Sequence, residues 1–287
     1  IDEDDIQSVV DVLKSNHLTQ GAKVQEFEEE FSKYTNSNFA VSVSNGTTAL
    51  HLCVKALGLE AGDKVLTTSN TFVASANCVL YEGGEIDFVD IDPRSYLLDL
   101  DKLEKKLSDS PNEYKGIVIV DFAGYPVDME RLSLIAKKYN LWIIEDACHA
   151  IGGEFLNSNG GKEKVGNGKY ADLTIFSFHP VKHITAGEGG LITTRNEDLY
   201  KKLLLLRSHG ITKDSNDFIG ENQGGWYYEM QELGYNYRLS DVNCALVLSQ
   251  LKKIGKNLER RREIANLYNE KLKDLESIRT PFVRDGF

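Results

Sequence analysis

Hydrophobic and polar positions along this chain follow two periods, one typical of helices and one typical of strands. Segments 4–14 and 24–34 repeat apolar residues every three or four positions, which predicts two amphipathic helices. Segment 39–44 alternates like a strand and runs into the small polar turn Asn45-Gly46-Thr47-Thr48. Helical spacing then resumes through Leu57.

Short apolar runs rich in β-branched residues then alternate with helical segments. The predicted strands are 64–68, 85–89, 116–121, 141–146, 173–176 and 191–194, and the predicted helices include 100–107, 129–139 and 197–207. A further helix is expected to start near Phe72, capped by Asn70 and Thr71. Near-continuous apolar strands between helices indicate a largely parallel sheet covered on both faces. After residue 240 a long helix is predicted to reach about Glu276, with a bend at Gly255.

Composition and charge narrow the class of protein. The 287 residues are 41% hydrophobic and 27% charged, which is typical of a globular protein with one large domain or two smaller ones. A net charge of −11 without a basic cluster argues against a nucleic-acid partner. No apolar run approaches the roughly 18 residues of a membrane span, and the acidic first residues do not resemble a signal peptide. We therefore expect a cytoplasmic protein without a membrane partner.

The four cysteines are widely spaced in apolar surroundings: Cys53, Cys78, Cys148 and Cys244. This pattern predicts reduced core residues and neither a disulfide framework nor a zinc site. No metal site is expected.

The first candidate for chemistry is a lysine that follows a predicted buried strand. Ser177, His179, Lys182 and His183 come directly after that strand, and the turn sequence 187–190, GEGG, follows. Ligands bind at the carboxyl ends of parallel strands. A lysine that is desolvated or near other cations there becomes a nucleophilic amine. The alternative is an ordinary solvated loop lysine.

Two further features join this candidate. The turn Asn45-Gly46-Thr47-Thr48 between a strand and a helix offers free backbone N–H groups and hydroxyls, which suit a phosphate, although it could be a plain helix cap. Asp121 and Asp146 each end a predicted strand, where an aspartate can serve a ligand or merely cap a helix.

Together these residues match the requirements of pyridoxal phosphate. The turn would bind its phosphate with Ser177, Phe72 would stack on its ring, and Lys182 would react with its aldehyde. Asp146 would keep the pyridine nitrogen protonated, because an adjacent anion favours the charged form.

The sequence also resembles a known family. Residues 177–185, SFHPVKHIT, followed by GEGG and preceded by EDACHA at 145–150, are similar to sugar aminotransferases of the DegT/DnrJ/EryC/StrS family. The likeness extends from residue 18 to residue 251. It implies an α/β protein of the pyridoxal phosphate-dependent transferase fold type I, with a mixed, mostly parallel sheet sandwiched by helices. It also implies an N-terminal helical segment over 1–20, a large cofactor-binding domain over 21–240, and a linking helix over 241–287 that enters a small, here truncated, C-terminal domain.

The resemblance assigns roles to individual residues. Lys182 would bind the cofactor covalently and carry the proton of the transamination, and Asp146 would pair with the pyridine nitrogen. His149 would face the phenolate oxygen of the cofactor, with a core histidine as the alternative. The other cofactor-binding residues would be Gly46, Thr47, Thr48, Phe72, Ser177 and Asn236. In the family, the residue similar to Asn236 reaches the cofactor phosphate of the neighbouring subunit, which implies a homodimer with shared active sites.

Three short motifs within the family resemblance bear on the substrate. The stretches 18–21, 207–211 and 226–230 most resemble family members that serve pseudaminic acid biosynthesis. They imply ping-pong transfer of an amino group from L-glutamate to C4 of a UDP-linked 4-keto-6-deoxy N-acetyl sugar. The alternatives are a GDP- or dTDP-linked keto sugar, or a non-catalytic relative that binds pyridoxal phosphate, which the intact Lys182 and Asp146 disfavour. Candidate donors to the anionic nucleotide sugar, by position alone, are His183, His209 and Lys213.

Overall fold

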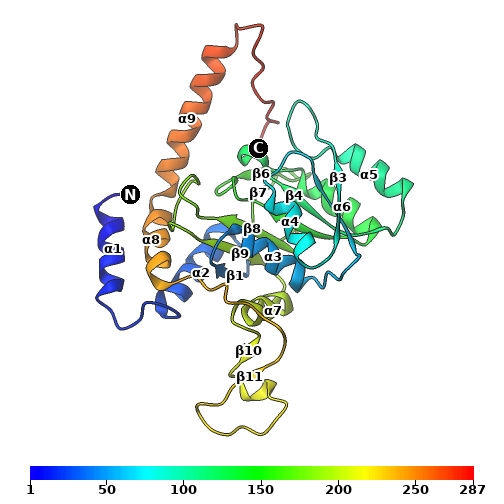
Figure 1. Cartoon of the computed structure of the whole chain (residues 1–287). Coiled ribbons are helices and arrows are strands. Elements are labelled where there is room, and N and C mark those ends of the chain that lie inside the picture. Colours follow the sequence, from blue (N-terminus) through cyan, green and yellow to red (C-terminus); the bar gives the residue numbers. More distant parts are fainter.

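A seven-stranded sheet forms the centre of the computed structural model, which describes residues 1–287 (Figure 1). The strands lie in the order β1-β9-β8-β5-β4-β2-β3. Their bounds are β1 (Phe39–Val43), β2 (Lys64–Thr68), β3 (Glu85–Val89), β4 (Tyr114–Val120), β5 (Trp142–Asp146), β8 (Leu173–Ser177) and β9 (Gly190–Thr194). Strand β9 is antiparallel to both of its neighbours, and the other pairs in the sheet are parallel. The predicted mixed, mostly parallel sheet is confirmed.

Helices cover both faces of this sheet. Their bounds are α1 (Glu3–Leu13), α2 (Ala22–Thr35), α3 (Gly46–Ala56), α4 (Ala74–Tyr81), α5 (Leu100–Asp109), α6 (Met129–Tyr139), α7 (Glu197–Arg207), α8 (Asp241–Lys252) and α9 (Ile254–Leu272). Strand β4 shows the two layers, because Val118 packs with α3, α4 and α7 whereas Ile117 and Ile119 pack with α5 and α6. Alternate side chains of one strand therefore enter different cores, which explains the near-continuous apolar runs in the sequence.

Two helix predictions were wrong in detail. Helix α4 begins at Ala74, and its cap position is Val73, which makes no side-chain capping bond. The expected cap fails because the Thr71 hydroxyl bonds instead to the Ser75 hydroxyl, at 2.8 Å. The long C-terminal helix is two helices, α8 and α9, and the break lies at Lys253 rather than at Gly255.

The break at Lys253 coincides with a contact to the N-terminal helix. The Lys253 ammonium lies 2.5 Å from the Asp2 carboxylate and 2.7 Å from the Asp5 carboxylate. Helix α1 thus packs beside α8, and α9 continues away from the sheet (Figure 1). Residues 273–287 return toward the sheet, where the Phe287 ring contacts Tyr125 and Phe155. The division into segments 1–20, 21–240 and 241–287 stays a prediction.

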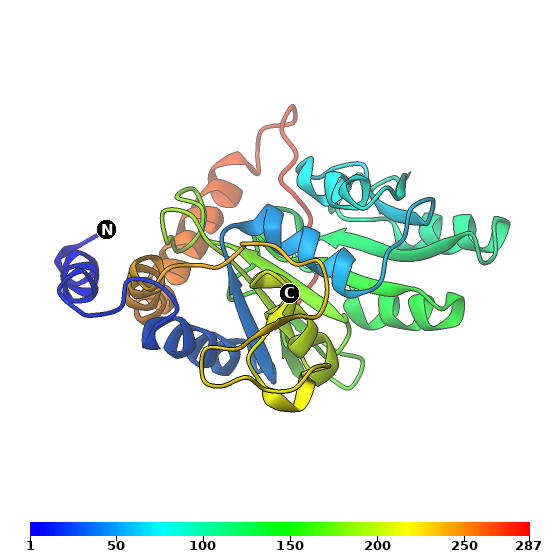
Figure 2. The same ribbon diagram turned by 60° about the horizontal axis from the view of Figure 1, so that its bottom comes forward.

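Two small two-stranded ribbons were not predicted. Strands β6 (Glu154–Leu156) and β7 (Lys162–Lys164) form one, and β10 (Ile211–Thr212) and β11 (Glu229–Met230) form the other. The second ribbon belongs to residues 208–233, which we call the arm. The arm hangs below the sheet in Figure 1 and comes toward the viewer in Figure 2. Among the helices, none has the length and apolar character that crossing a membrane requires.

Candidate active site

A cavity of about 560 Å³ opens at the carboxyl ends of the central parallel strands. It brings together seven of the predicted site residues, which come from α3, the loop before α4, β5 and β8, and the segments that follow these two strands: Gly46, Thr47, Phe72, Asp146, His149, Ser177 and Lys182. Residues far apart in the sequence meet here because parallel strands end at the same edge of a sheet. Thr48 and Asn236 do not line this cavity.

The start of α3 forms one end of the cavity. The Asn45 carboxamide accepts a hydrogen bond from the Thr48 N–H at 2.9 Å, and the Thr48 hydroxyl accepts one from the Asn45 N–H at 3.1 Å. This reciprocal cap occupies the Thr48 side chain, which explains why Thr48 does not face the cavity. The N–H groups of Gly46 and Thr47 have no intrahelical partner, so they are available to an anion.

Two glycines keep the backbone bare at this end of the cavity. A Cβ atom on Gly46 would lie 3.1 Å from Ser177 Cβ and 3.4 Å from Cys148 Sγ. A Cβ atom on Gly190 would lie 2.4 Å from the Asn45 carbonyl oxygen, so β9 can pass this turn only without a side chain there. Bare backbone at a helix start, facing a serine hydroxyl, fits the phosphate group of pyridoxal phosphate.

Asp146 presents the carboxylate of the cavity. It ends β5 and is 5% exposed. Its Oδ2 accepts a hydrogen bond from the Ser75 hydroxyl at 2.9 Å, and its Oδ1 accepts one from the Cys148 N–H at 3.2 Å. Each oxygen keeps a lone pair for a further partner, so the carboxylate is oriented and can still accept a proton donor from a ligand.

Asp121, the alternative carboxylate, does not line the cavity. It is fully buried, and its Oδ1 accepts a hydrogen bond from the Val127 N–H at 2.9 Å. Burial and the nearby Glu145 carboxyl raise the pKa of Asp121 well above its usual value. The geometry therefore favours Asp146 over Asp121 as the group that meets a ligand.

Lys182 lies in the turn after β8, where its N–H donates to the His179 carbonyl oxygen at 2.9 Å. Its side chain is half-buried and lines the cavity beside His149. Burial and the charge of Lys182 lower the pKa of His149, although Asp146 acts in the opposite direction. A neutral imidazole near pH 7 can share a proton with a phenolate oxygen, so the position of His149 suits its predicted role.

The three candidate donors to an anionic substrate lie outside this cavity. Burial, with Arg261, His149 and Lys182 nearby, lowers the pKa of His183 to about 4. His183 is therefore neutral at pH 7 and supplies no positive charge to a phosphate. His209 and Lys213 belong to the arm and do not line the cavity.

Aromatic side chains flank the mouth of the cavity. Phe72 lines it from the loop between β2 and α4, with 70% of its surface exposed. Phe122 lines it from the segment after β4, and its ring centroid lies 6.5 Å from that of His149. An exposed phenylalanine beside a polar cavity is available to stack on a flat ligand ring.

Sequence reasoning missed several lining residues. Thr71 was assigned to a helix cap, and Cys148 to the core, but both line the cavity. Glu188 also lines it and stands within the GEGG turn, so the motif itself carried a signal. Ser75, which lies behind the cavity wall and contacts Asp146, carried no such signal in the sequence, because a serine in the first turn of a helix is ordinary.

Asn236 lies at the base of the arm with its side chain exposed. The neighbouring rings of Tyr235 and Tyr237 stack with centroids 4.9 Å apart. The Tyr235 hydroxyl donates to Glu82 at 3.0 Å, and the Tyr237 hydroxyl lies 3.1 Å from His51 Nδ1. The chain on both sides of Asn236 is therefore fixed while its amide faces outward.

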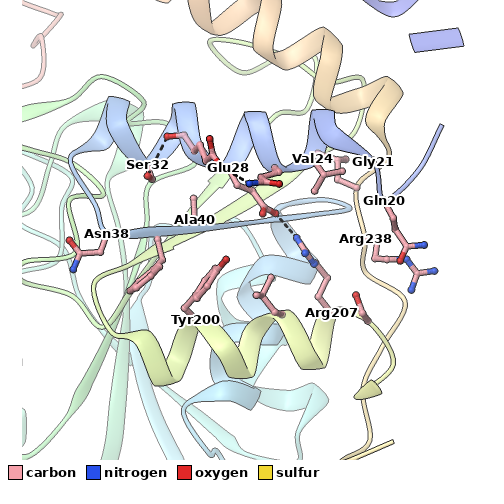
Figure 3. Close-up of a pocket in the computed structure, with 16 residues that line it drawn as sticks. Gln20, Gly21, Val24, Glu28, Ser32, Asn38, Ala40, Tyr200, Arg207 and Arg238 are labelled. Atoms are coloured by element: carbon pink, nitrogen blue, oxygen red, sulfur yellow. Dashed lines mark hydrogen bonds and ion pairs between the residues drawn. The ribbon is translucent and has the colours of Figure 1, made fainter. Parts of the chain in front are cut away.

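A second cavity, of about 510 Å³, lies between α2 and α7 and contains none of the predicted site residues (Figure 3). Glu28 and Arg207 form an ion pair across it, with 2.5 Å between Oε1 and Nη1. Glu28 accepts the Ser42 N–H at 2.8 Å, and Arg207 donates to the Ser42 carbonyl oxygen at 2.8 Å. The pair satisfies the open edge of β1, so we interpret it as structural.

Comparisons with known proteins identify the family of this chain. The DegT/DnrJ/EryC1/StrS aminotransferase family matches residues 1–285. The UDP-4-amino-4,6-dideoxy-N-acetyl-beta-L-altrosamine transaminase of Campylobacter jejuni serotype O:2 is 45% identical over 285 residues, which cover 99% of this chain and 71% of the relative.

Solved structures share the fold. Helicobacter pylori PseC, described as an aminotransferase involved in the biosynthesis of pseudoaminic acid, has a TM-score of 0.84 and 34% identity, covering 96% of this chain and 70% of that chain. The PLP form of the putative sugar aminotransferase Spr1654 from Streptococcus pneumoniae has a TM-score of 0.83 and 29% identity, and the match covers 96% of this chain and 70% of that chain.

Proposed function

The chain belongs to the DegT/DnrJ/EryC1/StrS aminotransferase family of pyridoxal phosphate-dependent enzymes, and we propose that its substrate is a UDP-linked 4-keto-6-deoxy N-acetyl sugar. The amino group would come from L-glutamate and would be transferred to C4 of the sugar in a ping-pong reaction. The observation that carries this choice is the 45% identity to the C. jejuni altrosamine transaminase along 285 residues.

The residues of the cavity suit the cofactor at each of its reactive groups. When bound, pyridoxal phosphate supplies an aldehyde that receives amino groups and a ring that accepts electrons. Lys182 would hold the cofactor through its amine, and Gly46, Thr47 and Ser177 would bind the phosphate. Phe72 would pack against the ring and His149 would share a proton with its phenolate oxygen.

Asp146 and Lys182 would perform different electrostatic tasks. Asp146, held by two protein donors, would keep the ring nitrogen charged, because a nearby anion favours the protonated form. Lys182 would move the proton between substrate carbon and cofactor carbon in both halves of the reaction, as a positioned general acid and base. Asp146→Asn should therefore retain the cofactor but lose most of its turnover.

The substrate choice is tested with half-reactions. The enzyme is converted with L-glutamate, freed of the donor, and mixed with UDP-, GDP- or dTDP-linked 4-keto sugars while the visible absorbance of the cofactor is followed. We expect the UDP-linked N-acetyl sugar to restore the absorbance. Restoration only by a GDP- or dTDP-linked sugar would refute the sugar choice and leave the aminotransferase activity standing. A response only to simple 2-oxo acids would refute nucleotide-sugar use.

We also propose that two copies of the chain share their active sites. Asn236 is exposed and lies outside the cavity of its own chain, so its predicted contact with a cofactor phosphate requires a second copy. The adjacent arm exposes large apolar side chains, including Ile219 at 89% and Trp226 at 70%. Several exposed apolar side chains on one projecting segment favour burial against a partner.

A further inference from the structure

A buried serine on α4 contacts the carboxylate proposed to meet the cofactor ring. Ser75 is 0% exposed, and its hydroxyl donates to Asp146 Oδ2 at 2.9 Å. The Thr71 hydroxyl lies 2.8 Å from the Ser75 hydroxyl and can donate to it. Thr71 lines the cavity, so the pair of hydroxyls links the cavity wall to Asp146.

This contact differs from the usual behaviour of a serine in a helix. Helical serines commonly bond to a carbonyl oxygen of the preceding turn, as Ser133 on α6 does with Glu130 at 2.8 Å. Ser75 instead directs its hydroxyl across to β5. A hydroxyl that leaves its own helix to reach a strand-end carboxylate has a role beyond the helix.

The surroundings make this hydroxyl important to Asp146. The other hydrogen bond that the carboxylate receives comes from the Cys148 N–H, at 3.2 Å. Burial raises the pKa of Cys78 to about 12, so this neighbour stays a neutral thiol. Burial also raises the pKa of Cys53 well above its usual value. The two hydrogen bonds that orient the carboxylate therefore come from the Ser75 hydroxyl and the Cys148 N–H.

We propose that Ser75 is a positioning residue for transamination: it fixes Asp146 and stabilises its negative charge so that the proton stays on the cofactor ring nitrogen. The inference rests on the proposed role of Asp146. Without the Ser75 hydroxyl, the carboxylate would be less well oriented and would attract the shared proton more strongly. The ring nitrogen would then carry less positive charge and would accept electrons less well.

The test compares two ligands that differ at the ring nitrogen. Apoenzyme is titrated with pyridoxal phosphate and with its carbocyclic analogue, in which CH replaces the nitrogen. We expect Ser75→Ala to weaken binding of pyridoxal phosphate about tenfold, as for loss of a hydrogen bond to a charged group, and to leave the analogue unchanged. In the holoenzyme kcat should fall about tenfold with little change in KM for L-glutamate.

Matched variants separate this role from a packing effect. We call the tighter binding of pyridoxal phosphate than of the carbocyclic analogue the preference. Ser75→Thr keeps a hydroxyl and should keep this preference, whereas Ser75→Cys, with a weak donor of similar size, should lose most of it. Ser133→Ala removes a helix hydroxyl that lies away from the cavity, and it should change the binding of neither ligand. If Ser75→Ala does not fold, the comparison of Ser75→Cys with Ser75→Thr still distinguishes a role of the hydroxyl from a packing effect.

Each of the other possible results would refute either the role of Ser75 or the role of Asp146. Equal weakening of both ligands by Ser75→Ala, or equal preference in Ser75→Cys and Ser75→Thr, would reduce Ser75 to a packing residue. If Asp146→Asn lowers the preference but the Ser75 variants do not, the inference fails while the role of Asp146 stands. If Asp146→Asn leaves the preference intact, the role of Asp146 fails and the inference fails with it.

Discussion

Two carboxyl groups buried behind the cavity should make the stability of the fold depend on pH. Asp121 is fully buried and Glu145 is 3% exposed. Burial and Glu145 raise the pKa of Asp121, and burial raises the pKa of Glu145 to about 6, although the Thr174 hydroxyl opposes this. The folded protein therefore holds a proton on this pair at pH values where the unfolded chain has released it.

The sign and size of the effect follow from linkage. For groups with a raised pKa in the fold, the stabilisation is full below their unfolded pKa, near 4, and is lost as pH rises through the folded values. Each retained proton lowers the free energy of unfolding by about 1.4 kcal/mol per pH unit. One shared proton thus predicts a loss of about 3 kcal/mol between about pH 5 and pH 7.

The perturbation is Asp121→Asn, which puts a neutral amide in place of the protonated carboxyl and keeps an oxygen for the Val127 N–H. We expect the variant to match the wild type near pH 5 and to be more stable at pH 7 by about 1–3 kcal/mol. The assay is urea unfolding followed by circular dichroism across this pH range at one protein concentration. Asp109→Asn, at an exposed carboxylate of α5, is the control. Parallel pH profiles for wild type and Asp121→Asn would refute the reasoning.

Three further predictions concern the cofactor site, the docking of α1 and the dimer. Gly46→Ala should weaken binding of pyridoxal phosphate at least about tenfold, since its Cβ would lie 3.1 Å from Ser177 Cβ, whereas Gly255→Ala, in open space, should not; titration of the apoenzyme checks both. Although burial alone would raise the pKa of Asp5, hydrogen bonds from Lys253, Ser249 and Gln250 lower it, so its stabilisation is present at neutral pH and is lost as pH falls below about 4. Asp5→Asn should therefore cost about 2 kcal/mol at neutral pH and less in acid, measured by urea unfolding, and an equal cost at both would contradict this. Mixed Lys182→Ala and Asn236→Ala subunits should regain part of the activity, because one site of the hybrid is intact; no regain despite verified exchange would argue against shared sites.

The sequence predicted the sheet and seven of the residues that line the cavity because both follow from local pattern. Near-continuous apolar runs marked the buried strands, and the strand ends placed Asp146, Ser177 and Lys182 at one edge. The break at Lys253 was not predictable, because it coincides with contacts from the ammonium to carboxylates nearly the whole chain away. The role of Ser75 was hidden for the same reason, since its partner lies on another strand.

The choice between Asp121 and Asp146 shows where pattern and register must be combined. In the parallel pairing of β4 with β5, Val120 lies opposite Asp146, and both line the cavity. Successive side chains of a strand point to opposite faces, so Glu145 and Asp121, each one position away from this pair, turn from the cavity. They meet behind it, where burial keeps a proton on them. A shift of one residue along the strand therefore separates Asp146, whose carboxylate can meet a ligand, from Glu145 and Asp121, whose carboxyl groups make the stability of the fold depend on pH. Because a sequence does not state which residues of neighbouring strands pair, it could name both aspartates but could not assign these opposite roles.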